Sequence, residues 1–559
     1  MKQITGYECK NVCYMPSSTD GDDALFVKEN IHYDDGTYEP NFRKIENYKR
    51  DVYIVKPGLR NYREKKIAEP LSRLQKYTCT QRKLSEQIVK ALGLFGGRDM
   101  PLRRICRSPY VYGADITSAT LVKRQYKQKY PHLVSPNSLA VLDIETDVEH
   151  SDDNKTIIAI SMTYKKNAVL VATKKFLEGV VNVEERLEKL IEKYLGDVIE
   201  RRGIKVDFKI VDTPGQAVQY VMAAAHRLQP DWMACWNINF DLPRLIAAVN
   251  DEGLDAGDVF CDPRVPKKYR NARYIEGQLS KLTSSGKHQS LAPHEQWHRF
   301  DVPSSFYWID AMVVYAMIRK AKGNESSYKL EDVLNQNIDR GKLNFTEAEG
   351  KHGLEWHYFM QTRYKLEYLV YNLFDSISVE MLDEKTNDLR LTLPELVDFG
   401  ETHTFKSTPK QLADDLHFFC LEKGMVISTT SDQMLDELDE HVISREGWII
   451  TLPAHLLAED GMCLFEDFPE IKSLAYKDVA DLDVKSSYPY TEIFANVCRS
   501  TTLMEICEIK GITDEERRLV GINLTGGVTN AVEFCTTMYK LPQLDTLLDA
   551  YEQELKRVA

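Results

Sequence analysis

The sequence predicts a multidomain protein that combines α/β and α+β architecture. Its 559 residues are enough for about three to five domains. Residues 1–135 mix short strands with polar turns, whereas strands and helices alternate from residue 136 onward. After residue 476 a strand, a sharp turn and the start of a helix follow one another. We therefore expect a mixed, β-rich region first, an α/β domain in the middle and a further small region at the end.

The composition is that of a soluble globular protein, with 28% charged and 43% hydrophobic residues. No apolar run approaches the ~18 residues that a transmembrane helix needs, and the start of the chain lacks the apolar core of a signal peptide. The eleven cysteines include no C-x-x-C pair, which predicts a reduced, cytosolic compartment rather than a zinc site. The net charge of −13 argues against a protein coated in nucleic acid, but a local basic groove would still allow a DNA enzyme.

The N-terminal region contains polar turns at 18–23 and 33–40 and no catalytic constellation. Two stretches, 43–66 and 123–130, combine basic residues with tyrosines. We interpret both as solvated surface. The alternative is a rim that contacts template phosphates and stacks bases on tyrosine.

The α/β region opens on a strand, LAVLDIETDV at 139–148, that carries two acids on one face. A strand in a core should not do so unless a divalent metal, a basic partner or water compensates the charge. The alternative is a strand end that meets solvent. Because successive side chains of a strand point to opposite faces, one face takes Leu139, Val141, Asp143 and Glu145, and the other takes Ala140, Leu142 and Ile144.

The following segments extend the α/β pattern. Two strands within 156–173 are joined by a turn at Lys165, Lys166 and Asn167. The later expected elements are a helix that begins near 183, a strand at 205–213, a helix at 214–228 and a strand at 231–236.

Two further places bring acids to the ends or faces of elements. A short apolar strand runs into Asn237, and Phe240 with Asp241 opens a helix. Farther along, Tyr371 and Asp375 share one face of an expected helix because they are four residues apart.

Residues 262–302 interrupt the α/β rhythm and are rich in lysine and arginine. The part at 269–288 is either a β-hairpin or a mobile surface loop, and the sequence leaves both open. The cations of this insert, among them Lys267, Lys268 and Arg270, are candidates for contacts with DNA phosphates.

Four short motifs, in order along the chain, resemble those of family B DNA polymerases. They are D-I-E at 143–145, N-x-x-F-D at 237–241, Y-x-x-x-D at 371–375 and D-V-K-S-S-Y-P at 483–489. The first three resemble the exonuclease motifs of that family, and the fourth resembles its first polymerase motif, D-x-x-S-L-Y-P. The chain looks most similar to polymerases of large tailed phages, firmly from 139 to 502 and loosely before. Four matches in the order of the family are hard to attribute to chance.

The resemblance implies three domains. An N-terminal domain at 1–135 would be completed by about 385–475, and a 3′→5′ exonuclease domain with a ribonuclease-H-like fold would span 136–384. A partial polymerase palm with the first polymerase motif would occupy 476–559. The insert would then be the hairpin that similar polymerases use to pass a primer between their two sites.

Hydrolysis of a phosphodiester at a 3′ end needs an activated water and a counter-charge for the leaving oxygen, which two Mg²⁺ or Mn²⁺ ions about 3.5–4 Å apart can supply. Such ions prefer carboxylate oxygens. Glu145 would also orient the attacking water, and Tyr371 would hydrogen-bond that water or the phosphate, unless it is simply a packed helix tyrosine. Phe240 would stack on a terminal base or pack in the core, and we favour the core. The resemblance thus implies Asp143, Glu145, Asp241 and Asp375 as metal ligands, Tyr371 as a further catalytic residue, and Asn237 and Phe240 as substrate contacts.

In the fourth motif, the resemblance implies a metal bound by Asp483 and the Val484 carbonyl, with Ser486 and Tyr488 at the nucleotide. Tyr488 would exclude a ribose 2′-OH. The sequence departs from the family at Ser487 and also at Tyr490, and it contains neither a K-x-x-x-N-S-x-Y-G helix nor a D-T-D turn. Without that second acid the palm cannot hold two metals for nucleotide transfer, so we expect polymerase activity to need a second chain.

Three interpretations follow. The first is the N-terminal portion or split subunit of a family B DNA polymerase, with proofreading exonuclease, acting in DNA replication. The second is a stand-alone 3′→5′ DNA exonuclease, and the third is a non-enzymatic DNA-binding assembly subunit. The expected partners are a single-stranded 3′ end, a primer–template and a second chain with the remaining palm and thumb, with a sliding clamp as a further candidate. We expect no membrane contact and a cytoplasmic location, in the host if a phage encodes the chain.

Overall fold

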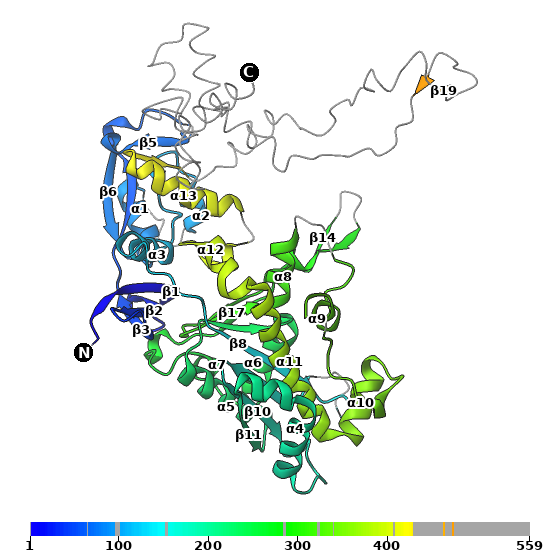
Figure 1. Cartoon of the computed structure of the whole chain (residues 1–559). Helices are drawn as coiled ribbons and strands as arrows, with labels where there is room; N and C mark the ends of the chain where they lie inside the picture. Colours follow the sequence, from blue (N-terminus) through cyan, green and yellow to red (C-terminus); the bar gives the residue numbers. More distant parts are fainter. Residues whose placement is uncertain are drawn as a thin grey trace. The chain divides into compact units, whose positions relative to one another are not determined.

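The computed structural model describes most of the first 428 residues and two short strands beyond them (Figure 1). The chain is a mixed α/β protein that divides into two compact units. These units cut across the segments 1–135, 136–384 and 476–559, whose boundaries stay a prediction. The first unit comprises Met1–Asp51, Thr78–Gln87 and Ile116–Asp414, and the second comprises Val52–Tyr77, Ile88–Asp115 and Asp415–Ala559. The described residues are 2–63, 65–94, 101–150, 155–282, 287–320, 325–338, 340–405, 408–428 and the paired strands β19 (Met462–Cys463) and β20 (Lys472–Ser473).

The first unit is built around a six-stranded mixed sheet. Strand β9 runs antiparallel to both of its neighbours, and the other five strands share one direction. The α/β character expected from residue 136 onward is therefore confirmed. In order across the sheet, the strands are β11 (Lys205–Val211), β10 (Asn167–Thr173), β9 (Ile157–Tyr164), β8 (Leu139–Thr146), β12 (Trp232–Cys235) and β17 (Tyr307–Asp310).

Helices pack on both faces of this sheet. Leu142 and Ile144 of β8 pack with α5 and α6, whereas Leu139 and Val141 pack on the opposite side with α8, α9 and α11. The alternation predicted for this strand is therefore confirmed. The first face is covered by α5 (Pro214–Leu228), α6 (Ile238–Asp251) and α7 (Ala256–Phe260). The second is covered by α4 (Val183–Arg202), α8 (Ala311–Arg319), α9 (Leu330–Ile338), α10 (Gly353–Arg363) and α11 (Lys365–Thr386).

Helix α11 lies close against β8 and β9 and is buried along most of its length. Small side chains allow this approach: Ser376 is fully buried, and its hydroxyl lies 2.6 Å from that of Ser161 in β9. The Ser161 hydroxyl also donates to the carbonyl of Asn372 at 2.8 Å. These bonds satisfy buried polar groups and fix the position of the helix relative to β9, which pairs with the strand that carries the predicted acids.

A three-stranded antiparallel sheet of the N-terminal region belongs to the same unit. Its connections confirm the polar turns expected near 18–23 and 33–40, but the strands are longer than expected, since β1 has 13 residues and β2 has 11. The fully buried Lys28 of β2 donates to the carbonyl of Gln229 at 2.7 Å, just after α5. The sheet consists of β1 (Ile4–Pro16), β2 (Asp23–Tyr33) and β3 (Tyr38–Glu46), with α3 (Ser118–Lys129) packed on β1.

The basic insert contains paired strands rather than an unstructured loop. Of the two alternatives left open by the sequence, the structure has paired strands: β14 (Ser280–Leu282) pairs with β15 (His288–Ser290), and β13 (Arg273–Ile275) pairs with β16 (Arg299–Asp301). Several of its cations are bound to acids: Lys268 contacts Asp20 and Asp22, and Arg270 contacts Asp258. These two cations therefore have structural partners within the chain. A role of the insert in primer transfer stays a prediction.

The second unit contains two small antiparallel sheets and short helices. Arg50–Val55, Leu74–Cys79, Leu84–Leu92 and Thr408–Glu422 run across its boundaries with the first unit. Among the described residues, no helix of either unit is long and apolar enough to cross a membrane. The elements are β4 (Arg50–Val55), β6 (Leu74–Cys79) and β7 (Val111–Tyr112) in one sheet, β5 (Ala68–Pro70) and β18 (Met425–Ile427) in the other, and α1 (Leu84–Leu92), α2 (Leu102–Cys106) and α13 (Thr408–Glu422), while α12 (Leu393–Val397) lies in the first unit.

Candidate metal centre

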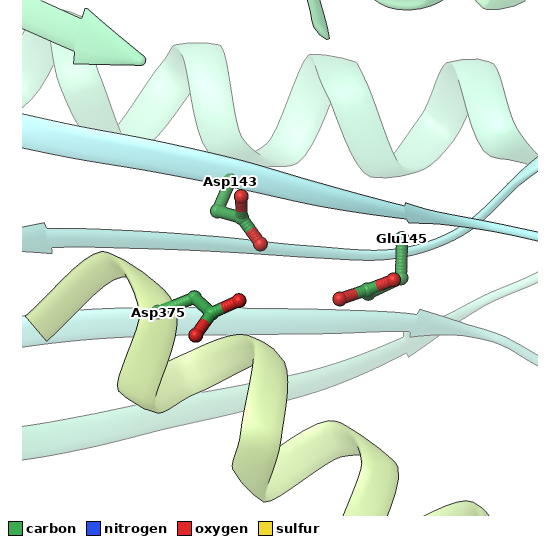
Figure 2. A group of neighbouring side chains, drawn as sticks. All are labelled: Asp143, Glu145 and Asp375. Carbon is green, nitrogen blue, oxygen red and sulfur yellow. The ribbon is translucent and has the colours of Figure 1, made fainter. Parts of the chain in front are cut away.

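Strand β8 presents Asp143 and Glu145 toward helix α11. The two acids are two residues apart, so both side chains leave the same face of the strand. Asp143 lies opposite Ser161 of β9, at the place where α11 is held closest to the sheet. Figure 2 shows both carboxylates extending from the strand toward the helix.

Helix α11 supplies the third acid, Asp375. Ligand oxygens of Asp143, Glu145 and Asp375 all lie within 4.8 Å of one another. Figure 2 shows the three carboxylates converging on one space between strand and helix. Glu145 and Asp375 are buried, at 7% and 3% exposure, and Asp143 is half-buried. The structure thus brings together residues that are more than 220 positions apart in the sequence.

Each of the three carboxylates has one protein partner that orients it. The Asn372 amide donates to Asp143 at 2.7 Å, and the Lys342 ammonium donates to Asp375 at 2.5 Å. The Tyr368 hydroxyl donates to Glu145. These bonds hold the acids in place but leave other lone pairs open. In the described part of the chain, the second oxygen of Asp375 is buried without any hydrogen-bond partner.

Burial and mutual repulsion make these acids hard to ionise together. Burial and the charge of Asp375 raise the pKa of Asp143 to about 8, and burial with the charge of Asp143 raises the pKa of Glu145. Burial also raises the pKa of Asp375, although Lys342 opposes this effect. Like charges held this close destabilise one another unless a cation lies between them.

The group therefore fits a divalent cation. Three carboxylates supply the hard oxygen ligands that Mg²⁺ and Mn²⁺ prefer. The unpartnered buried oxygen of Asp375 is an open ligand, and a cation would relieve the repulsion that helps to raise the pKa values of Asp143 and Glu145. These three residues can hold a metal ion. The alternative reading of the strand as ending in solvent is wrong, because α11 covers its acids.

Asp241 lies near this group but outside it. It is buried in the first turn of α6, and burial together with the charges of Asp143 and Asp310 raises its pKa. Its carboxylate is not among those that converge within 4.8 Å in the described part of the chain. The role of Asp241 as a fourth metal ligand stays a prediction.

The two predicted substrate contacts are at the start of α6. Asn237 occupies the N-cap position of the helix, where its side chain makes no capping hydrogen bond, and it is exposed. Phe240 is 37% exposed, and the guanidinium of Arg244 lies 3.7 Å from the centre of its ring. The core position that we favoured for Phe240 is therefore wrong: one turn of helix carries the ring to the surface. Contact of either residue with substrate stays a prediction.

Tyr371 is a packed helix tyrosine, which was one of the two alternatives for it, and its hydrogen bond with the water or the phosphate stays a prediction. Its ring is 8% exposed and packs against Tyr368 and Trp356, with ring centres 5.9 and 4.9 Å apart. Its hydroxyl nonetheless accepts a hydrogen bond from Lys342 at 2.8 Å. Burial and the charge of Asp375 raise the pKa of Tyr371, so the hydroxyl keeps its proton.

Several residues at the site escaped the sequence analysis. Tyr368 and Asn372 lie seven and three positions before Asp375, so helical spacing could have placed them on its face. Lys342 carries no such signal, because it comes from an irregular segment between α9 and α10 and reaches the site only through tertiary packing. His357 lies 3.9 Å from Glu145, but burial lowers its pKa to about 4, so this ring is neutral at pH 7.

Asp310 is a further buried acid that the sequence analysis did not select. It ends β17, and its carboxylate accepts backbone N–H groups of Ile238 and Val313, each at 2.9 Å. These bonds cap the first turns of α6 and α8. Asp310 therefore has a structural role that helps to set the position of Asp241.

The residues of the fourth motif, Asp483, Val484, Ser486 and Tyr488, lie outside the described residues, as does the whole segment 476–559. A comparison with protein-family models finds no model that matches this chain, and a comparison with curated proteins finds no match either. The function of the site therefore has to be argued from its own chemistry.

Proposed function

We propose that this chain is a metal-dependent 3′→5′ DNA exonuclease of ribonuclease-H-like fold. The observation that carries the proposal is the convergence of Asp143, Glu145 and Asp375 within 4.8 Å between a central strand and a buried helix. Two features support the fold assignment: a mixed sheet with one antiparallel strand, and acids presented from the strand next to it. The order of the D-I-E, N-x-x-F-D and Y-x-x-x-D motifs supports a DNA 3′ end as substrate.

Asp143, Glu145 and Asp375 would hold the Mg²⁺ or Mn²⁺ ions, two in number, with Asp241 as the candidate fourth ligand. When bound, such ions supply an activated water and a counter-charge for the leaving oxygen. Residues of the chain would orient the water and adjust the charge of the ligands. Tyr368 fixes one oxygen of Glu145, which leaves the other free to orient the water. Lys342 lowers the pKa of Asp375 against the larger effect of burial.

The surroundings of the site can hold the end of a DNA strand. Phe240 is an exposed ring on the first turn of α6, where it can stack on a terminal base, as aromatic side chains do in single-strand binding. Arg244, beside that ring, offers a cation to a phosphate. Tyr371 and Lys342 together present a hydroxyl and an ammonium next to the carboxylates.

The wider proposal is that this nuclease proofreads for a family B DNA polymerase. It rests on the resemblance of the motif at 483–489 and on the order of all four motifs. The proposed assembly has a second chain with the rest of the palm and thumb, and DNA as its substrate. A stand-alone exonuclease is the alternative, and primer extension assayed with and without a candidate second chain separates the two.

The direct test is degradation of a 5′-labelled single-stranded oligonucleotide by the purified full chain. We expect a ladder of shortening products with Mg²⁺ and none with EDTA. The isosteric variant D143N/E145Q should lose at least ~10³-fold in rate, which corresponds to about 4 kcal/mol of barrier.

The matched control is E184Q/E188Q, which neutralises two exposed acids of α4. It should cleave at the wild-type rate. Undiminished cleavage by D143N/E145Q would show that the carboxylates take no part in the chemistry. Immediate release of the 5′ label as a mononucleotide would show degradation from the 5′ end and contradict the proposed polarity.

A further inference from the structure

A cavity of about 640 Å³ lies at the opposite end of the central strand from the carboxylates. Leu139, the first residue of β8, is part of its wall, whereas Asp143 comes four residues later. Four residues of a strand span roughly 13 Å. Helix α11 links the two places as well, because Glu380 and Glu384 on the cavity wall follow Asp375 on the same helix. The cavity is thus a separate site on shared elements.

Cationic side chains from three places in the chain surround this cavity. We name it the cationic pocket and define it by Lys165, Lys166, Arg201, Arg202, Arg390 and Tyr38. The two lysines form the β9–β10 turn, the two arginines end α4, and Arg390 follows α11. Among the described residues, two acids, Glu380 and Glu384, line the same space, and Arg390 is paired with Asp383 at 3.2 Å. Two positive charges remain in excess in this part of the chain, so the pocket favours an anion.

The two acids of the pocket are already committed to Arg202. Its guanidinium donates to Glu380 at 2.7 Å and to Glu384 at 2.6 Å. This fork holds Arg202 in one orientation. Glu380 is 1% exposed, and its second oxygen is buried without a hydrogen-bond partner in the described part of the chain.

Two other cations are left for the ligand. Lys166 and Arg201 are exposed, and neither has an acidic partner among the described residues. The turn that presents Lys166 is unusual, because Lys165 has a φ of 55°, in the left-handed region where asparagine and glycine are preferred. Arg390 lies in a turn of π-helix, Asp388–Thr392. Irregular backbone of both kinds concentrates at functional sites.

One part of the wall is suited to a base. Tyr38 is 40% exposed and lines the cavity together with the cations, and Met381 and Ile338 add apolar surface. Exposed aromatic rings bind bases by stacking with little regard to sequence. The volume lies within the range of small-molecule sites, about 300–1,000 Å³.

The geometry points to a nucleotide-binding function for the cationic pocket, with phosphates at Lys166, Arg201 and Arg202 and the base at Tyr38. The ligand is a nucleotide phosphate, either as a free nucleotide or as part of a single strand. This inference does not depend on the nuclease proposal, because none of these residues belongs to the carboxylate group.

The test is calorimetric titration of the full chain in EDTA, which removes divalent cations from the carboxylates and prevents cleavage. Three probes are used: dATP, inorganic tripolyphosphate and a 5′-phosphorylated single-stranded 12-mer. We expect dATP or the 12-mer to bind more tightly than tripolyphosphate, and the tighter of the two identifies the source of the nucleotide. The variant K166E/R201E should weaken binding at least tenfold, and Y38A should weaken dATP binding but not tripolyphosphate binding.

The matched control is K189E/K209E, which makes the same change in net charge at exposed lysines outside the pocket. Its affinity should stay within twofold of wild type. Equal losses of affinity in K166E/R201E and the control would show that only the overall charge of the protein matters, and would overturn the proposal. So would absence of binding by every probe, or tripolyphosphate that binds as tightly as both dATP and the 12-mer. Because the substituted side chains are exposed, thermal melting of the neutral variant K166Q/R201Q checks that folding is intact, and this variant should also weaken dATP.

Discussion

The two ends of strand β8 and helix α11 carry opposite charge. At one end Asp143, Glu145 and Asp375 converge, with the cation Lys342 beside them. At the other end five cations of the cationic pocket surround two acids. The same strand and helix therefore support two kinds of site. The two sites differ in solvent exposure: the acids lie between packed elements, whereas the cations come from turns and helix ends that reach solvent.

This difference determines what each end can bind. Buried acids repel one another strongly because the local dielectric is low, so their natural partner is a small, hard cation. Exposed cations on flexible stems can surround a larger, multiply charged anion. The comparison predicts that a substitution at one end should change its own ligand and leave the ligand of the other end unaffected.

The largest effect on stability is expected from Lys342→Met. Burial opposes the charge of Lys342, but the carboxylates of Asp375 and Asp143 outweigh it and raise its pKa. Loss of one member of a buried ion pair costs about 3–5 kcal/mol. Because Lys342 is 23% exposed, we expect about 2 kcal/mol in EDTA. Chemical unfolding of wild type and variant measures it.

Saturating Mg²⁺ should reduce this loss, because the metal supplies the missing positive charge. Lys342→Arg, which keeps the charge, is the control and should lose less than about 1 kcal/mol. A loss for Lys342→Met that is the same with and without Mg²⁺ would show that the lysine acts only through packing.

A smaller effect on the free energy of unfolding is expected from Glu380→Gln, in the cationic pocket. Its pH dependence should be opposite to that of most carboxylates. Burial raises the pKa of Glu380 from 4.5 to about 7, against the opposing charges of Arg202 and Arg390 and a hydrogen bond with Thr163. A raised pKa means that the folded state binds the proton more tightly. The stability that this proton contributes is complete below about pH 4.5 and is lost as the pH rises through about 7.

Glu380→Gln should therefore remove a decline in the free energy of unfolding between these pH values. The shift corresponds to at most about 3 kcal/mol, and access of water through the cationic pocket should reduce it to about 1 kcal/mol. Urea unfolding at pH 4.5, 6 and 7.5 measures the difference between wild type and variant. Parallel pH profiles for the two proteins would contradict the raised pKa. Glu384→Gln, at an exposed neighbour, serves as control and should keep the wild-type slope.

Much of the carboxylate site could be predicted from the sequence. Alternation along 139–148 placed Asp143 and Glu145 on one face, and a four-residue spacing placed Tyr371 and Asp375 on one side of a helix. These are local periodicities, which sequence records directly. The prediction that this strand and this helix lie together in the fold rested on the resemblance of the motifs rather than on spacing.

The rest depends on contacts that no local pattern encodes. Lys342 lies in an irregular segment and meets Asp375 only through the packing of α9 and α10 around α11. Phe240 was assigned to the core because it is apolar, yet the first turn of α6 carries it to the surface. The cationic pocket escaped notice because its residues come from separate turns and helix ends, each of which reads as solvated surface when taken alone.

The most direct measurement is Mn²⁺ binding to the full chain by isothermal titration calorimetry. The account predicts binding by wild type and a loss of affinity of at least ~100-fold in D143N/D375N. It also predicts wild-type binding in E380Q/E384Q, which neutralises the two acids of the cationic pocket. Wild-type affinity in D143N/D375N, or an equal loss in both variants, would contradict the central claim that the acids of β8 and α11 form the metal centre.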